Sequence, residues 1–209
     1  MKVAVVDYGM GNLHSVAKAL AVAADERLSI EITQNPAVIE QADKVVFPGV
    51  GAMRDCMIGL NEKGLDQALN TVYTNGKPIL AICIGLQSLM SFSEENDGTQ
   101  CLNWFNGEVK KFPKNNGLKV PHMGWNQVKQ SVPHPLWQDI PDGARFYFVH
   151  SYYVALADQS LQCASTEYGH SFVSAIAHKN LCAVQFHPEK SQKNGLLLLR
   201  NFLRWDLGL

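Results

Sequence analysis

Short apolar runs alternate with amphipathic segments throughout the first half of the chain. The runs at residues 2–6, 29–33, 44–47 and 79–82 are rich in Val and Ile and have the length of strands. Between these runs, apolar residues recur at helical spacing at 13–24, in a short segment from 36, and over 53–73, where the pattern is interrupted. Another helical pattern follows the fourth run and extends to about residue 92. Because parallel strands need a crossover connection, this alternation predicts an α/β fold with a mostly parallel central sheet covered on both faces.

The pattern changes after Glu94. Short strand candidates at 104–112, 118–121 and 127–129 are separated by Asn-Gly and Pro, which indicates an antiparallel excursion on the sheet. Further strands are predicted at 145–149, 161–165, 172–178 and 181–186, and a last helix begins near Ser191 as its N-cap. Since repeats, low-complexity tracts and linkers are absent from the sequence, we expect a single domain over 1–209.

Composition narrows the class of protein. Hydrophobic residues make up 46% and charged residues 18%, which is enough for a packed core and argues against disorder. A net charge of −1 provides neither a basic footprint for nucleic acid nor a polybasic membrane patch. The N-terminal apolar run at 3–6 is too short for a signal peptide, and the longest runs have strand length. We therefore expect a soluble, cytoplasmic protein without nucleic-acid or membrane partners.

The five cysteines are an odd number without C-x-x-C spacing, so a disulfide framework or a zinc site is not expected. Cys83 differs from the others because an apolar strand leads into it and a helix follows directly. A cysteine attacks as the thiolate, which the N–H groups and dipole of a helix N-terminus favour. Gly85 permits a tight turn, and the N–H of Ile84 would face an oxyanion beside the sulfur. The alternative is a buried core cysteine.

A second candidate group lies in the sequence His187-Pro188-Glu189. Proline keeps the preceding histidine extended, and residues two apart on an extended segment face the same side. The Glu189 carboxylate can therefore accept one ring N–H of His187 while the other ring nitrogen faces a thiol. Of the seven histidines, this one has a carboxylate two residues later and follows an apolar strand. The alternative is a surface turn.

The strand at 44–47 runs into Pro48-Gly49-Val50-Gly51, whose glycines let backbone N–H groups approach a ligand, although an ordinary turn would look similar. Gln87 lies one helical turn after Cys83, so its amide could touch a substrate. Gly9-Met10-Gly11 resembles part of a dinucleotide fingerprint, but His14 occupies the third glycine position. A tight interface loop is favoured there, and no cofactor or metal is expected.

The segments PGVG at 48–51, AICIGLQ at 81–87 and HPEKS at 187–191 resemble the class I glutamine amidotransferases, whose fold is flavodoxin-like. Segments 7–16, 120–126 and 147–153 resemble, within that class, the glutaminase subunits of imidazole glycerol phosphate synthase. The resemblance implies that Cys83 attacks glutamine and forms a glutamyl thioester, with His187 carrying protons and Glu189 orienting it. It also implies an oxyanion site at Ile84 with Val50 or Gly51, and glutamine contacts from Gly49, Gln87, Ser151 and Tyr152.

In such enzymes ammonia passes into a cyclase subunit, which makes imidazole glycerol phosphate for histidine biosynthesis, so a heterodimer is expected. The candidate docking residues are Asn12, Pro121, His122, Met123, Gly124, Trp125, Asn126 and Lys190. For Met123 and Trp125, core packing is an equally open interpretation. Ala81 replaces a glycine that the family usually has, and slightly altered packing beneath Cys83 is expected. The other functions considered are a different class I amidotransferase and a non-catalytic regulatory module on the same fold.

Overall fold

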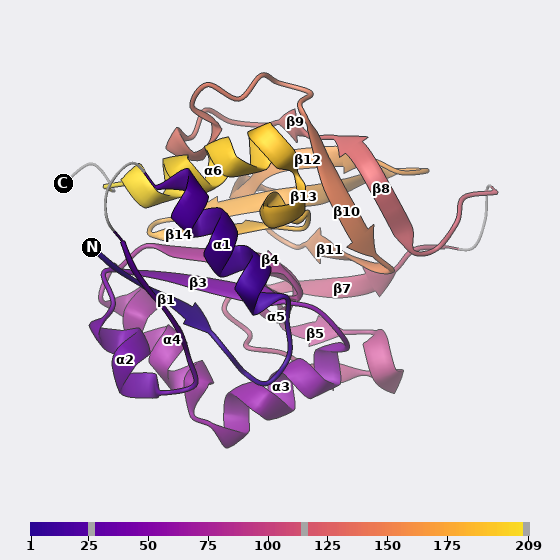
Figure 1. The fold of residues 1–209 in the computed structure, drawn as a ribbon. Helices are drawn as coiled ribbons and strands as arrows, with labels where there is room; N and C mark the ends of the chain where they lie inside the picture. Colours follow the sequence, from indigo (N-terminus) through magenta and orange to yellow (C-terminus); the bar gives the residue numbers. More distant parts are fainter. Residues whose placement is uncertain (25–27, 114–116, 207–209) are drawn as a thin grey trace.

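The computed structural model describes residues 1–24, 28–113 and 117–206. One half of its main sheet consists of parallel strands (Figure 1). In spatial order these are β2 (Ser29–Thr33), β1 (Lys2–Val6), β3 (Lys44–Gly49), β4 (Ile79–Cys83) and β14 (Leu181–Val184). Every residue of β3, β4 and β14 is buried, which is expected of parallel strands covered on both faces. The predicted fold class is therefore confirmed.

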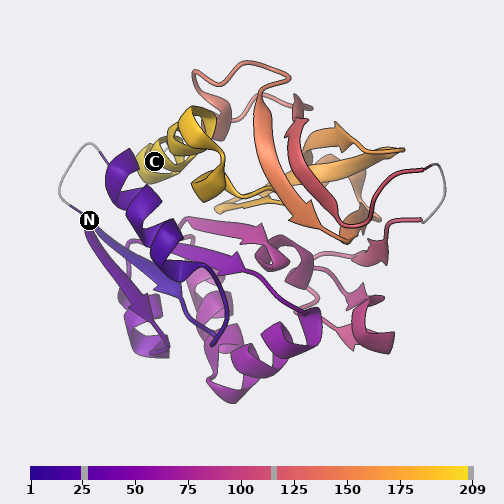
Figure 2. The ribbon, with the colours of Figure 1, turned by 45° about the vertical axis from the view of Figure 1, so that its right-hand side comes forward.

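The other half of the sheet is mostly antiparallel. It continues from β14 through β13 (Ser171–His178), β11 (Tyr152–Leu156), β7 (Gly107–Lys111), β5 (Phe92–Ser93) and β6 (Thr99–Gln100). Off this path, β13 also pairs with β12 (Gln162–Glu167), which pairs with β9 (Lys129–Gln130). A separate antiparallel ribbon joins β8 (His122–Gln127) to β10 (Arg145–His150), and Figure 2 shows the two strands side by side.

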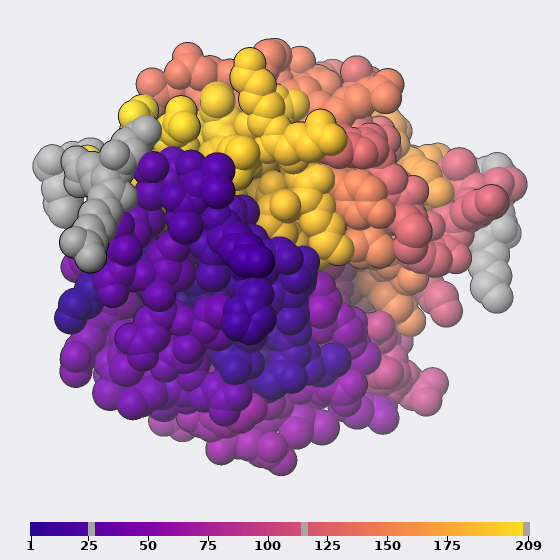
Figure 3. Space-filling model, in the orientation of Figure 1, coloured from indigo at the N-terminus to yellow at the C-terminus, as the bar shows by residue number. Residues whose placement is uncertain are grey.

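Helices cover both faces of the parallel half. One face carries α1 (Leu13–Ala23) and α6 (Gln192–Arg204), which lie next to each other on the surface in Figure 3. The opposite face carries α2 (Pro36–Gln41), α3 (Met53–Glu62) and α4 (Leu65–Thr74). A short helix, α5 (Ile84–Ser88), follows β4 directly. Single 3₁₀ turns are η1 (Glu95–Asp97), η2 (Pro135–Trp137), η3 (Gln159–Leu161) and η4 (Pro188–Lys190).

Two sequence predictions are wrong at their boundaries. The helix expected to reach about residue 92 ends at Ser88, because the carbonyls of Leu89 and Met90 accept hydrogen bonds from loop amides at 103–105. The strand expected at 118–121 is absent, and the pairing begins after it, at His122. Pro121 has no N–H to donate to a neighbouring strand, so the strand begins at the residue after it.

Other boundaries shift by smaller amounts. The strand expected at 104–112 covers Gly107–Lys111, since the amides of Trp104 and Phe105 bond to Leu89 instead of a neighbouring strand. The candidate at 127–129 spans the end of β8 and the start of β9. The strand β11 was not predicted at all. The break expected within 53–73 is confirmed, and it falls at Gly64, which adopts φ 65° between α3 and α4.

Candidate active site

Cys83 occupies a strained turn at the end of β4. Its backbone has φ 56° and ψ −106°, a region that residues with a side chain rarely adopt. The turn requires Gly85, because a Cβ atom there would lie 2.3 Å from the main-chain oxygen of Phe47 on the adjacent strand. The Ala81 methyl is fully buried, 3.4 Å from that Cβ position. The methyl group that departs from the family pattern therefore fits beneath the turn.

Close backbone approach also explains Gly49. A Cβ atom on Gly49 would lie 2.6 Å from the Cβ of Ile84 and 2.9 Å from the amide nitrogen of Gly85. The end of β3 is thus pressed against the start of α5, so the loop after Gly49 lies beside Cys83. Gly51 follows with φ 101°, a conformation that favours glycine.

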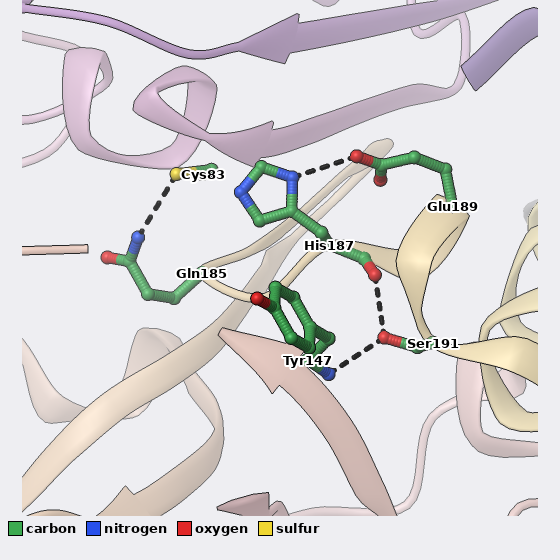
Figure 4. Close-up of polar contacts among 6 residues, drawn as sticks. All are labelled: Cys83, Tyr147, Gln185, His187, Glu189 and Ser191. Atoms are coloured by element: carbon green, nitrogen blue, oxygen red, sulfur yellow. Dashed lines mark hydrogen bonds and ion pairs between the residues drawn. The ribbon is translucent and has the colours of Figure 1, made fainter. Parts of the chain in front are cut away.

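His187 and Glu189 form a buried pair on the segment that follows β14. His187 Nδ1 lies 2.9 Å from Glu189 Oε1, and each side chain is 2% exposed. His187 Nε2 is buried and has no hydrogen-bond partner among the residues that the structure describes. In Figure 4 the ring stands between Glu189 and Cys83, with this second nitrogen toward the sulfur. The carboxylate accepts from Nδ1 and so sets the orientation and the tautomer of the ring.

The electrostatics of this group favour a charged imidazole. Burial lowers the pKa of His187, but the neighbouring Cys83 thiolate and the Glu189 carboxylate outweigh burial and raise the pKa to about 10. An imidazolium beside a thiolate is the state in which a cysteine is ready to attack and a histidine is ready to donate a proton.

Ser191 has a role that the sequence did not indicate. It sits at the start of α6, but its side chain makes no capping hydrogen bond, so the predicted N-cap bond is absent. Its hydroxyl instead donates to the main-chain oxygen of His187 at 2.6 Å and accepts the N–H of Tyr147 at 2.9 Å (Figure 4). The N–H of His187 donates to the oxygen of Tyr147 at 2.9 Å. These bonds fix the backbone of the histidine against β10.

A cavity of about 470 Å³ opens in front of Cys83. It is lined by Asn12, Val50, Gly51, Cys83, Ile84, Gln87, Glu95, Pro121, Val149, His150, Ser151, Tyr152, His187 and Lys190. Most of the residues predicted to bind substrate or oxyanion are therefore brought together, while Gly49 and Glu189 lie behind the lining. Sequence reasoning missed Glu95, Val149 and His150. Glu95 lies in the turn η1, and Val149 and His150 lie on β10. No local sequence pattern indicates that these elements reach the cavity.

Gln87 lines the cavity, where its amide was expected to be able to touch a substrate, but its amide nitrogen already has partners in the protein. Its Nε2 donates to the main-chain oxygen of Tyr152 at 2.9 Å and to Gln185 Oε1 at 3.0 Å. Its Oε1 is buried without a partner, so this oxygen is the atom available to a ligand.

The predicted docking residues fall into two sets. Met123 and Trp125 on β8 are 62% and 42% exposed, so core packing does not account for them. His122 is buried on the same strand and bonds to His150, with its Nδ1 2.9 Å from His150 Nε2. Asn126 bonds inward to His122, and Gly124 lies between the exposed residues. Lys190 Nζ lies 6.0 Å from the centre of the Tyr147 ring.

Within residues 1–24, 28–113 and 117–206, no group of three or more His, Cys, Asp and Glu side chains is arranged to hold a metal ion. In the same ranges, no helix combines the length and the apolar character needed to span a membrane.

The nucleophile turn, the His-Glu pair and the cavity define a cysteine-dependent hydrolase site on an α/β fold. A family model described as glutamine amidotransferase class-I matches residues 4–205. The chain is 53% identical to imidazole glycerol phosphate synthase subunit HisH of Acinetobacter baylyi, over 99% of each chain. It is also 53% identical to the HisH subunit of Pseudomonas syringae, over 98% of this chain and 97% of that one. The protein therefore belongs to the class I glutamine amidotransferases and, within them, to the HisH subunit family.

Solved structures agree in fold. A glutamine amidotransferase from Thermotoga maritima superposes with a TM-score of 0.66 at 14% identity, covering 100% of this chain and 99% of that one. PurLQS from Thermotoga maritima gives a TM-score of 0.74 at 14% identity, with 97% of each chain covered. At these identities the likeness concerns the fold alone.

Proposed function

We propose that this protein is the glutaminase subunit of an imidazole glycerol phosphate synthase and acts in histidine biosynthesis. The observation that carries the proposal is the convergence of Cys83 with the His187–Glu189 pair from segments far apart in sequence, with Cys83 and His187 lining one cavity and Glu189 behind the ring. The 53% identity to HisH subunits over nearly the whole chain supports the choice of reaction. The cytoplasmic location and the single domain expected from the sequence stay predictions.

In the proposed mechanism the Cys83 thiolate attacks the side-chain carbonyl carbon of glutamine. The carbonyl oxygen becomes an oxyanion, which the N–H of Ile84 and that of Val50 or Gly51 stabilise. Collapse of this intermediate forms the glutamyl thioester, while His187 gives a proton to the leaving ammonia. His187 then takes a proton from water, whose oxygen attacks the thioester and releases glutamate. Glu189 holds the imidazole in the tautomer that both proton transfers require.

Glutamine is held by groups that surround the cavity. Gly49 shapes the loop that carries Val50 and Gly51, and Gln87 offers its unpartnered oxygen. Ser151 and Tyr152 also line the cavity. Ammonia leaves toward a cyclase subunit, which docks as the second member of a heterodimer. The docking residues we propose are Asn12, Pro121, His122, Met123, Gly124, Trp125, Asn126 and Lys190, with Met123 and Trp125 offering the exposed apolar surface and His122 acting from beneath it.

The test uses the complex with its cyclase and the Cys83→Ala variant. Glutamine-dependent synthesis of imidazole glycerol phosphate is expected to fall at least about a thousandfold, because the nucleophile is gone. Synthesis from free ammonia is expected to continue, since the acceptor chemistry belongs to the partner. Cys101→Ala, a cysteine outside the cavity, is the matched control. Loss of the ammonia-dependent rate in an assembled Cys83→Ala complex would contradict the division of labour.

A further inference from the structure

A buried glutamine that the proposed reaction does not use lies against the nucleophile. Gln185 follows β14 directly, is fully buried, and precedes His187 by two residues. Its Nε2 lies 3.7 Å from Cys83 Sγ, within the range of a hydrogen bond to the larger sulfur atom (Figure 4). A neutral thiol is a weak acceptor, whereas a thiolate carries a full charge and accepts more strongly. The contact therefore favours the charged form of the sulfur.

The orientation of this amide follows from its neighbours. The main-chain oxygen of Tyr152 can only accept, so the atom of Gln87 that faces it at 2.9 Å must be the nitrogen. The same nitrogen lies 3.0 Å from the Gln185 amide, which must present its oxygen there. The nitrogen of Gln185 is then left on the side of Cys83. The Tyr152 oxygen, from which this orientation follows, is itself held in place by His150 Nδ1 at 2.8 Å.

A thiolate at Cys83 needs a hydrogen-bond donor such as this amide. The long helix expected after Cys83 would have favoured a thiolate through its dipole. The observed helix α5 has only five residues, Ile84–Ser88, so its dipole is correspondingly small. Cys83 is itself only 4% exposed, which limits stabilisation of the charge by water. His187 supplies a positive charge on one side of the sulfur, and the Gln185 amide supplies an N–H on another.

We propose that Gln185 is a further catalytic residue, which donates an amide N–H to the Cys83 sulfur, stabilises the thiolate, and is held in that orientation by Gln87. The proposal rests on the proposed function in taking Cys83 as the nucleophile. It concerns the ground state of the sulfur before glutamine binds, so it can be measured without substrate or partner.

The experiment measures alkylation of Cys83 by iodoacetamide in the full chain, from pH 5 to pH 10, by mass spectrometry of the peptide that carries it. Gln185→Met keeps the length of the side chain and removes the donor. Gln185→Glu keeps an oxygen for Gln87 and, wherever its carboxyl is ionised, places a second oxygen that cannot donate against the sulfur. Ser174→Ala is the matched control, because Ser174 is buried and its main-chain oxygen accepts the N–H of Gln185 at 2.9 Å.

We expect Gln185→Met to react about tenfold more slowly than the wild type at the acid end of this pH range, the effect of one hydrogen bond to a charged acceptor. The two rates should converge at high pH, where the thiolate forms without help from the amide. Gln185→Glu should react more slowly than Gln185→Met wherever its carboxyl is ionised. Ser174→Ala should follow the wild type.

Three results would overturn the proposal. One is a Gln185→Met profile that superposes on the wild type, and another is a rate reduced equally at every pH, which a loss of packing would cause. The third is a Gln185→Glu variant that is as reactive as the wild type where its carboxyl is ionised, because that variant retains the bond to Gln87 and has no donor for the sulfur. Thermal unfolding identifies a variant that fails to fold, and the other variant then decides. Glutamate formation by the wild-type complex is measured in parallel, so failure of the proposed function is seen separately from failure of this inference.

Discussion

Acid should destabilise this protein through a pair of buried histidines. His122 and His150 are 3% and 6% exposed and share a hydrogen bond of 2.9 Å between His122 Nδ1 and His150 Nε2. Burial lowers the pKa of His122 to about 4. Burial, followed by the neighbouring His122 and His187, lowers the pKa of His150 to about 3, although its bond to the Tyr152 oxygen acts in the opposite direction. Both rings therefore stay neutral in the folded protein at pH values where they are charged in the unfolded chain.

The size of the effect follows from proton binding. With an unfolded pKa of about 6.5, each ring is about nine-tenths protonated in the unfolded chain at pH 5.5. The unfolded chain then binds about 1.8 more protons than the folded protein at these two positions. The free energy of unfolding should fall by about 2.5 kcal/mol per pH unit near pH 5.5, and by about 3 kcal/mol from pH 6.5 to 5.0. This is a large share of the stability of an ordinary domain.

Other groups change this slope in known directions. Burial also lowers the pKa of His134 and of His178, which adds to the loss in acid. His187, with its raised pKa, is protonated in the folded state and opposes the loss by less than about 0.5 kcal/mol over this range. Burial raises the pKa of Glu95, which opposes the loss as well. The His122–His150 pair should still dominate, because both rings are neutral and almost fully buried.

The assay is urea unfolding at pH 6.5, 6.0, 5.5 and 5.0, with the free energy extrapolated to water. His150→Gln removes one titrating ring and should lower the slope near pH 5.5 by about 1.2 kcal/mol per pH unit. His14→Gln changes an exposed histidine away from the pair and is the matched control. A slope below about 1 kcal/mol per pH unit in the wild type, or an unchanged slope in His150→Gln, would refute the reasoning.

Two further predictions concern the nucleophile turn. Gly85→Ala should destabilise the fold by about 2 kcal/mol or more, since the new methyl meets the rigid backbone oxygen of Phe47, whereas Gly76→Ala should cost about 1 kcal/mol for its left-handed backbone alone. Equal urea midpoints for the two variants would count against this. In Cys83→Ala the pKa of His187 should fall below its value of about 10, because the thiolate that raises it is removed. An NMR titration of the His187 ring checks this, and an unchanged pKa would disprove the cause.

Much of the parallel half could be predicted from the sequence because its signals are local. Buried parallel strands are continuous apolar runs, so the runs at 2–6 and 79–82 coincide with β1 and, to within one residue, with β4. The convergence of Cys83 with His187 could be expected for a similar reason. Each follows an apolar strand, and in a parallel sheet the carboxyl ends of strands meet at one edge. The pairing of Glu189 with the ring was expected from an extended segment, but only His187 is extended; Glu189 lies in the 3₁₀ turn η4 and still reaches Nδ1 of the ring.

The polar groups around this edge could not be predicted, because their partners are distant in the chain. Ser191 has the residue type and position of an N-cap, yet its hydroxyl bonds to the backbone of His187 and Tyr147. Gln87 has the position of a substrate contact, yet both of its observed donor bonds go to Tyr152 and Gln185. In each case a local pattern identified a polar side chain correctly, and tertiary contacts determined which atoms it bonds.

The register of β14 against β4 is the feature from which the catalytic arrangement follows. Ile82 pairs with Val184, so the next residues along the two parallel strands, Cys83 and Gln185, leave the sheet at the same level. His187 lies two residues beyond Gln185, after the bend at Gln185 and Phe186, and its ring also faces the sulfur (Figure 4). A single segment of the chain thus brings the Gln185 amide and the His187 imidazole to the Cys83 sulfur. A slip of one residue would turn both side chains to the opposite face and leave the sulfur without either. The apolar strand Leu181–Val184 therefore positions both side chains, since its pairing with β4 sets that register.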